Sequence, residues 1–150
     1  MPNCQTKFHG TLTFEPEQVL KVPRGLFGFA DETEFLLLEL PSSRPVVFVQ
    51  SVRSANLCFI ALPVQVIEAG YRLTLSSDTL TSLGYSQGAA PQMGKELLCL
   101  ALLTIGDRGA TANLLAPLVI DIASHRGAQV MVEGYSHQQP LSTQELQPQC

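Results

Sequence analysis

The chain contains 150 residues, of which 45% are hydrophobic and 15% are charged, and its formal net charge is −4. This composition excludes a chain kept disordered by its charge, and a domain of about 150 residues buries about 68–70% of its unfolded surface in one core. The negative charge argues against direct nucleic-acid binding, which needs lysine and arginine to displace counterions from phosphates.

The N-terminal third predicts short strands separated by prolines and polar turns. Residues 11–14 alternate threonine with a bulky apolar residue, and a second apolar run at 19–22 ends before Pro23. We therefore expect two strands around a turn. The apolar run at 35–40 is too short for a typical helix and is closed by Pro41, which favours a strand buried on both faces.

The middle of the chain continues the pattern of strands and turns. Two apolar runs, 46–50 and 57–62, are joined by a polar segment and predict a hairpin. Residues 71–75 alternate between apolar and polar side chains, which predicts another strand. Ser77 is then expected to cap a short helix that ends at Gly84.

The last third predicts a long strand and a hairpin. Residues 86–95 are small, polar and rich in helix breakers, so they predict a loop before an apolar strand at 96–105, and residues 106–111 predict a turn. Two alternating runs then flank the segment "ASHRG", where Gly127 is expected to take a positive φ in a hairpin turn. The side chains expected on one face of each run are Leu118, Ile120 and Ile122, followed by Ala128, Val130 and Val132.

These elements predict a mainly antiparallel β domain, either a small barrel or a sandwich, with about eight to nine strands and one or two short helices. We expect a single domain over residues 1–136. Residues 137–150 are rich in glutamine, serine and proline and have little to bury, which predicts a flexible tail.

No catalytic or metal-binding motif is found in the sequence. A nucleophile elbow, a phosphate-binding loop and an HExxH zinc motif are all missing, and the spacing of the three histidines matches no common metal site. The four cysteines are far apart, which favours free thiols, and Cys58 and Cys99 lie in apolar runs where burial raises a thiol pKa. We therefore expect no enzymatic activity, no cofactor and no metal.

Two features of the sequence predict a cytoplasmic location. The first residues lack the basic and apolar regions of a signal peptide. The longest apolar run, 96–106, is shorter than the roughly 18–20 residues that cross a bilayer.

The segment "VPRGLFGF" at 22–29 allows two interpretations. Two glycines around Leu26 and Phe27 indicate a tight turn that carries bulky apolar side chains beside Arg24. The turn either folds over one end of the core, with Phe27 and Phe29 as plugs, or stays partly exposed as a docking patch for a partner.

Asn113 stands between a glycine-rich turn and Pro117. Its amide can bond to backbone groups that no neighbouring strand reaches, whereas Pro117 has no N–H and belongs at the start or edge of a strand. Asn113 is therefore expected to serve the turn and not catalysis.

Five segments of the chain resemble the flagellar assembly factor (FliW) family, and they follow one another in the same order as in the family. The segment "VPRGLFGF" is similar to the family's FPxGxxGF turn, and "TANLLAPLVID" at 111–121 is similar to its TxNLxAPIVIN block. The other three are "TKFHG" at 6–10, "VVFVQSV" at 46–52 and "GAQV" at 127–130.

The resemblance implies a cytoplasmic, non-enzymatic binding protein with a compact β-barrel-like fold. Members of the family bind CsrA, an RNA-binding translational repressor, and relieve its block on flagellin synthesis; flagellin in turn binds them until it is secreted. Neither nucleic acid nor a membrane is then a direct partner. An acidic protein also suits a basic RNA-binding partner, because complementary charge speeds encounter.

Under this resemblance, the partner contacts are expected from the loops at 24–29 and 50–56 and from two further positions of the matched motifs. The candidate contact residues are Arg24, Leu26, Phe27, Gln50, Ser51, Asn56, Asn113 and Asp121.

The sequence departs from the family pattern at three places. Val22 replaces a phenylalanine, Asp121 replaces an asparagine, and the basic residue usual after Tyr135 is missing, with His137 and Gln138 in that stretch. If the missing basic residue contacts a partner, the affinity or the choice of partner differs in this chain.

Two other functions stay open at this point. One is a flagellin-specific chaperone that does not bind the regulator. The other is a small barrel that encloses an apolar ligand, with Phe27, Phe48 and Phe59 as its lining, although side chains usually fill barrels of this size.

Overall fold

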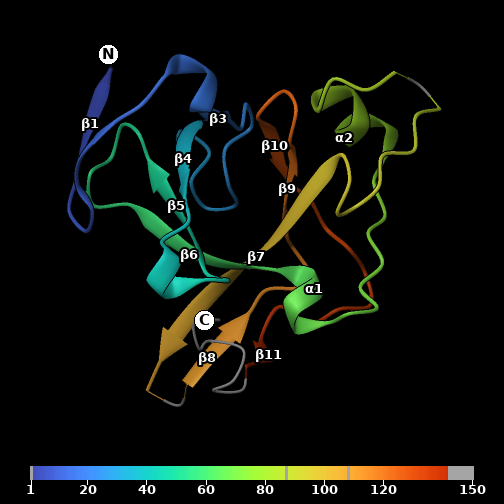
Figure 1. Cartoon of the computed structure of the whole chain (residues 1–150). Helices are drawn as coiled ribbons and strands as arrows, with labels where there is room; N and C mark the ends of the chain where they lie inside the picture. The colour runs from blue at the N-terminus through green and yellow to red at the C-terminus, as the bar shows by residue number, and fades with distance from the viewer. Residues whose placement is uncertain (1, 87, 108, 142–150) are drawn as a thin grey trace.

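Seven strands close into a barrel in the computed structural model, which describes residues 2–86, 88–107 and 109–141 (Figure 1). Neighbouring strands are antiparallel except β3 and β10, whose parallel pairing closes the barrel. The predicted β-barrel class is thus confirmed. The barrel strands are β3 (Leu20–Lys21), β4 (Glu34–Leu38), β5 (Val47–Ser51), β6 (Cys58–Pro63), β7 (Leu97–Gly106), β9 (Leu118–Asp121) and β10 (Arg126–Gln129).

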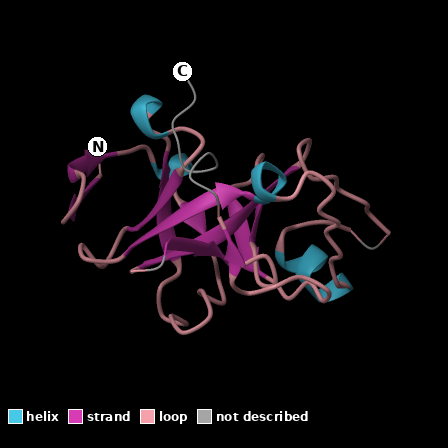
Figure 2. Cartoon of the chain, turned by 90° about the horizontal axis from the view of Figure 1, so that it is seen from below, coloured by secondary structure: helices cyan, strands magenta, loops and turns pink. Residues whose placement is uncertain are grey.

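The remaining elements lie around the barrel, as Figure 2 shows with its strands gathered at the centre and its helices at the periphery. β1 and β2 form a separate hairpin, while β8 and β11 extend the sheet beyond β7. The bounds of these elements are β1 (Asn3–Thr6), β2 (Gly10–Thr13), η1 (Pro16–Gln18), η2 (Pro41–Ser43), α1 (Val64–Ile67), α2 (Ser77–Ser82), β8 (Gly109–Ala112) and β11 (Gln139–Pro140).

Apolar side chains form three packed clusters, one of them inside the barrel. The interior cluster includes Phe35 and Leu100, both 0% exposed. A second cluster covers the outer face of β7 and β9, and a third lies between β4 and the β1–β2 hairpin. Because Phe35 belongs to the interior cluster and Leu36 to the third, β4 is buried on both faces as predicted.

Both predicted hairpins are present. β5 and β6 pair from Val47↔Ala61 to Gln50↔Cys58, and β9 and β10 pair from Leu118↔Gln129 to Asp121↔Arg126. The long apolar strand predicted at 96–105 is β7.

The predicted strand at 71–75 is wrong, because this segment pairs with no neighbouring strand. Its alternation reflects packing against the second cluster, in which Leu73 and Leu75 are partly buried. The Tyr71 ring stacks on Tyr135 with centroids 4.2 Å apart, and its hydroxyl donates to the Leu114 carbonyl over 2.5 Å. An extended segment that lies on a core alternates in burial just as a strand does.

The hairpin turn between β9 and β10 also differs from the prediction. His125, with φ +56°, takes the left-handed conformation expected of Gly127. Gly127 is instead closely packed, since a Cβ there would lie 3.2 Å from Leu20 Cδ1. Ile122 lies beyond β9 and is 47% exposed, so it does not share the buried face of Leu118.

Further corrections concern the ends of elements. Ser76, not Ser77, caps α2 by accepting a hydrogen bond from the Thr79 N–H, and Gly84 follows the helix with φ +94°. The polar β1 strand carries no apolar alternation and was not predicted. β2 pairs with it and not with residues 19–22.

Two segments predicted to lack strands contain short ones. The predicted turn at 106–111 includes the start of β8. The predicted tail at 137–150 begins with β11, which pairs with Thr111 and Ala112. The rest of that tail, residues 142–150, lies outside the described residues. No helix in the described ranges is long and apolar enough to cross a membrane.

The turn at 22–29 depends on Gly25. This glycine has φ +68°, and a Cβ there would lie 2.5 Å from the Phe29 carbonyl oxygen. Gly28 has φ +84°, and a Cβ there would have no other atom within 4 Å. The two glycines therefore share a conformation but differ in the space around them.

We predict that Gly25→Ala lowers the free energy of unfolding by more than about 2 kcal/mol, since strain and a backbone clash combine. Gly28→Ala is the matched control and is expected to cost about 1 kcal/mol, from conformation alone. Urea denaturation measures both. Equal losses would show that the close approach at Gly25 relaxes without cost.

Candidate partner-binding surface

One end of the barrel brings together most of the segments that the sequence singled out. We call this the loop end, and it consists of residues 22–33, 51–57 and 113–117. The Ser51 hydroxyl donates to Glu32 Oε1 over 2.5 Å, which joins the first two segments. Gln129 joins the first to the third, because its Oε1 accepts from the Phe27 N–H at 2.7 Å and its Nε2 donates to the Ala116 carbonyl at 2.9 Å.

The turn at 22–29 has one side chain buried in the core and others exposed, so each of the two interpretations holds for part of it. Leu26 is 2% exposed and belongs to the barrel interior, so Leu26 is the plug. Phe29 is partly exposed and makes an edge contact with Phe59 at 5.3 Å between centroids. Phe27 is 54% exposed, and Arg24 is exposed beside it. The expectation that Phe27 plugs the core is wrong.

Gln50 and Ser51 support the second loop from inside. Gln50 is 0% exposed, and its Nε2 points at four carbonyls of the loop, the nearest being those of Ser51 at 3.0 Å and Leu57 at 3.1 Å. Ser51 is also buried, whereas Asn56 is exposed. Of these three candidate residues, only Asn56 offers its side chain to a partner.

Glu32 ties this loop to the turn. It accepts hydrogen bonds from the hydroxyls of Ser51 and Ser54. These bonds, that of Ser51 first, hold the pKa of Glu32 below its usual range. The ionised carboxylate is thus the form that fixes the second loop.

Asn113 has the structural role predicted for it. Its Oδ1 accepts from the Ala116 N–H at 2.9 Å, and its own N–H donates to the Leu102 carbonyl. The side chain therefore closes the turn before β9, and Pro117 directly precedes that strand. Asn113 thus belongs to the third segment of the loop end, and its bond to Ala116 fixes the shape of that segment.

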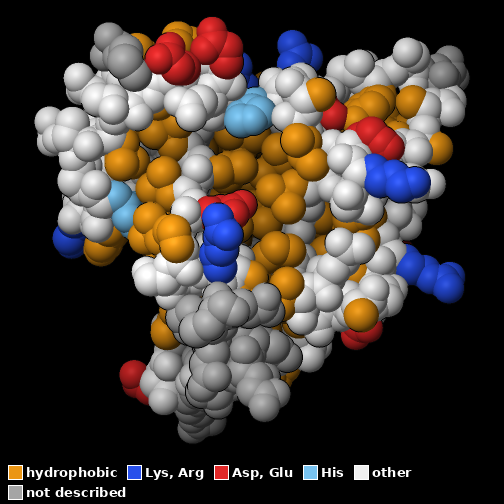
Figure 3. All heavy atoms as spheres, in the orientation of Figure 1, with side chains coloured by type: hydrophobic (Ala, Val, Ile, Leu, Met, Phe, Trp, Pro, Cys, Tyr) orange, Lys and Arg blue, Asp and Glu red, His pale blue; other side chains and the backbone are white. Residues whose placement is uncertain are grey.

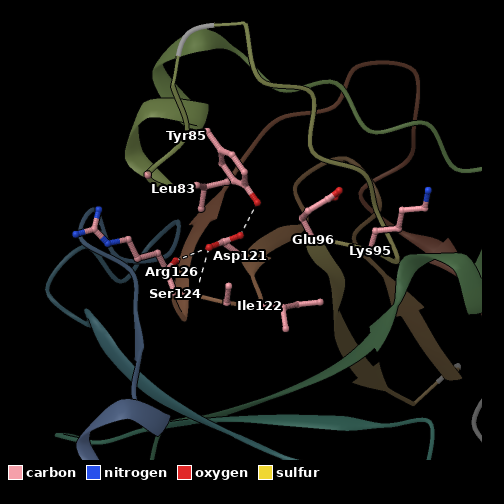
Figure 4. A pocket seen from close by; sticks show the side chains of 10 residues that line it. Leu83, Tyr85, Lys95, Glu96, Asp121, Ile122, Ser124 and Arg126 are labelled. Atoms are coloured by element: carbon pink, nitrogen blue, oxygen red, sulfur yellow. Dashed lines mark hydrogen bonds between the residues drawn. The ribbon is translucent and has the colours of Figure 1, made fainter.

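Asp121 lies at the other end of β9, away from the loop end. It is 7% exposed and accepts three hydrogen bonds: from the Tyr85 hydroxyl, the Ser124 hydroxyl and the Ser124 N–H (Figure 4). Burial by itself raises the pKa of Asp121, but the three bonds together outweigh it and hold the pKa below its usual range. Asp121 is thus an ionised structural anchor for the β9–β10 turn.

A surface hollow of about 640 Å³ opens beside Asp121. Figure 4 shows Tyr85 pointing at Asp121, with Glu96 and Lys95 on the other side and Ile122 at the base. Burial, followed by the hydrogen bond to Asp121, raises the pKa of Tyr85 to about 12. Tyr85 and Asp121 bond to each other and do not converge on the empty space.

The three phenylalanines proposed to line a ligand cavity lie in different places. Phe59 packs between Phe35 and Phe29, Phe48 contacts the His9 ring at 4.9 Å, and Phe27 is exposed. Leucines, valines and Phe35 fill the barrel interior. Among the residues that the structure describes, these three rings therefore do not line one common space.

The face shown in Figure 3 carries a broad area of hydrophobic side chains over β4 to β7, with charged side chains mostly around it. An exposed apolar area of this kind is typical of protein–protein interaction sites. The large hydrophobic residues that are exposed are Phe8, Phe27, Phe29, Leu40, Val66, Ile105, Ile122 and Met131.

The cysteines give no sign of reactive chemistry. Cys4, Cys58 and Cys99 are free thiols, and burial raises the pKa of each, to about 12 for Cys99. Cys150 lies outside the described residues. Within the described part of the chain, no group of three or more His, Cys, Asp or Glu side chains is placed to hold a metal ion.

Sequence reasoning missed two residues that organise the loop end, Gln129 and Glu32. Gln129 had a usable signal, since it is a polar residue between Ala128 and Val130 in an alternating apolar run. Glu32 had none, because its partners Ser51 and Ser54 are about twenty residues away in the sequence.

The position of Gln50 predicts a cost in stability. Gln50→Leu removes the donor that faces the loop carbonyls and should lower the free energy of unfolding by about 1–3 kcal/mol. Asn56→Ala, in the same loop but exposed, should change it by less than about 0.5 kcal/mol. Chemical denaturation of both variants is the measurement. If Gln50→Leu were as stable as Asn56→Ala, the assigned hydrogen bonds would not hold the loop.

The lowered pKa of Asp121 predicts a pH dependence. A carboxyl with a depressed folded pKa stabilises the fold above its unfolded pKa of about 3.9, and this contribution is lost as the pH falls through the folded value. Tyr85→Phe removes one donor and should cost about 1–2 kcal/mol at pH 7. The difference from the parent chain should shrink as the pH falls from about 4 towards about 2, as urea denaturation across this range would show. A difference that stays constant to about pH 2 would contradict the assignment.

Comparisons with known proteins agree on one family. The family model described as "FliW protein" matches residues 3–142. The flagellar assembly factor FliW of Bacillus licheniformis is 30% identical over 141 residues, covering 91% of this chain and 94% of that protein. The factor of the same name from Bacillus subtilis is 29% identical over 134 residues, covering 88% and 90%.

A solved structure supports the same assignment. The crystal structure of a flagellar assembly factor FliW superimposes with a TM-score of 0.78 at 26% identity, covering 93% of this chain and 95% of the other. The sequence match extends over the barrel and all three segments of the loop end. The chain belongs to the FliW family of flagellar assembly factors.

Proposed function

We propose that this protein is a non-enzymatic regulator of the cytoplasm that binds the translational repressor CsrA, relieves its block on flagellin synthesis, and is itself bound by flagellin. Release of flagellin for export then frees the protein to act on the repressor. The relatives are named flagellar assembly factors, which supports a role in building the flagellum. The two partners come from the family resemblance of the sequence.

The observation that carries this proposal is the exposed Phe27 on a turn whose backbone is fixed. Leu26 anchors the turn in the barrel, and the Phe27 N–H is bonded to Gln129. A large aromatic ring held outside the core costs little conformational entropy on binding, and such rings dominate the energetics of protein interfaces.

The loop end supplies further contacts from Arg24 and Asn56, which are both exposed. Leu26, Gln50 and Ser51 act from within by holding the loops in place, and Asn113 holds the turn before β9. An interface of standard size buries about 800 Å² on each partner, so other residues of this face take part as well.

The alternative function is a flagellin chaperone that does not bind the regulator. The same exposed turn serves both functions, and they differ only in which partner binds. A pull-down with CsrA and with flagellin from the same organism, followed by a gel-shift assay of CsrA on its RNA, separates them. Loss of RNA from CsrA supports the regulator, whereas binding of flagellin alone supports the chaperone.

Phe27→Asp should weaken at least one of the two complexes by about tenfold or more, because it puts a charge in place of an aromatic ring that the bound partner would bury. Its melting temperature should stay close to that of the parent chain, since the ring is exposed. Ile105→Asp is the matched control, because Ile105 is 63% exposed in the hairpin of β7 and β8, outside the three segments of the loop end. Isothermal titration calorimetry measures the dissociation constants.

Unchanged affinity of Phe27→Asp for both partners would remove the turn from the interface. A large fall in melting temperature would instead place the ring in the core.

A further inference from the structure

A small cleft lies beside Phe27, between the turn at 22–29, helix α2 and strand β10. We call it the Phe27 cleft. Its volume is about 270 Å³, which is less than the roughly 300–1,000 Å³ of small-molecule sites and fits a side chain of a protein partner better than a cofactor. The lining residues that matter here are Arg24, Phe27, Thr79, Ser82, Ala128 and Gln129.

The walls of the cleft are fixed by contacts within the protein. Gln129 bonds to the Phe27 N–H on one side and to the Ala116 carbonyl on the other. The Gly25 N–H donates to the Val22 carbonyl at 2.8 Å, which holds the base of the turn. Because the turn is bonded to Gln129 of β10 and α2 lies in contact with the same strand, the cleft is formed before any partner arrives.

The charge of the cleft differs from that of the whole protein. Arg24 is the one charged residue among those that line it. Asp78 lies one helical turn before Ser82 on α2, but it lines a different hollow, together with Ser77 and Thr81. A chain with net charge −4 thus presents, beside the exposed Phe27, a recess whose one charged lining residue is an arginine.

The neighbouring hollow does not reverse this charge. This is the hollow beside Asp121, and its charged lining residues are Lys95, Glu96, Asp121 and Arg126. The Asp121 carboxylate is already occupied by its three hydrogen bonds. Only Glu96 is left as an exposed carboxylate there.

We propose that the Phe27 cleft binds an extended protein segment that inserts one apolar side chain next to Phe27 and places a carboxylate on Arg24. Thr79 and Ser82 line the same recess, and a serine or threonine hydroxyl can bond to the backbone of the segment. An arginine guanidinium forms paired hydrogen bonds with a carboxylate, which favours an acidic segment over a basic one. This inference rests on the proposed function only in taking the partner to be a protein.

The test is a nuclear magnetic resonance titration of the full ¹⁵N-labelled chain with two defined peptides, acetyl-Leu-Phe-Glu-Asp-amide and acetyl-Leu-Phe-Lys-Lys-amide. The acidic peptide should shift the amide signals of Phe27, Thr79 and Gly127–Gln129 and should bind roughly fivefold more tightly than the basic one. Arg24→Glu should reverse this order. Arg72→Glu, at another exposed arginine, should leave it unchanged.

Three results would overturn the proposal. The first is that the peptides shift the signals of other residues, and the second is that the basic peptide binds as tightly as the acidic one or more tightly. The third is that the same amide signals shift with protein concentration when no peptide is present, because a second copy of the chain would then occupy the cleft. The spectra of the variants also show directly whether each is folded. Failure of the proposed function has a different signature, namely that neither CsrA nor flagellin binds in the pull-down whatever the peptides do.

Discussion

The parallel pairing of β3 with β10 is the constraint on which the rest of the structure depends. β3 and β10 come from opposite ends of the chain and close the barrel through one parallel pair, Lys21↔Arg126. A Cβ on Gly127 would lie 3.2 Å from Leu20 Cδ1, in β3, and 3.4 Å from Val22 Cγ2, where the turn at 22–29 begins. Closure of the barrel and placement of the exposed turn are therefore consequences of the same contact.

At the loop end, buried residues hold exposed neighbours in place. Leu26 is buried so that Phe27 can be exposed, and Gln50 is buried so that the loop carrying Asn56 keeps its shape. Gln129 then links the turn to the start of β9. The surface is thus rigid without being part of the core, which lowers the entropic cost of binding a partner.

Much of the fold could be predicted from local patterns, because β4 is apolar on both faces and polar segments separate the paired strands β5 and β6. The parallel closure could not, since β3 has only two residues and its partner follows about a hundred residues later. At the site, the glycines at 25 and 28 predicted the tight turn. They could not show which of Leu26 and Phe27 points inward, because that depends on the barrel beneath the turn.

The central claim is that partners dock on the loop end. Hydrogen–deuterium exchange of the protein alone and in complex with flagellin or CsrA tests it most directly. The account predicts that amides in residues 22–33 and 51–57 become protected in at least one complex, while the β9–β10 turn at 121–126 exchanges as before. Protection confined to 121–126 would contradict it.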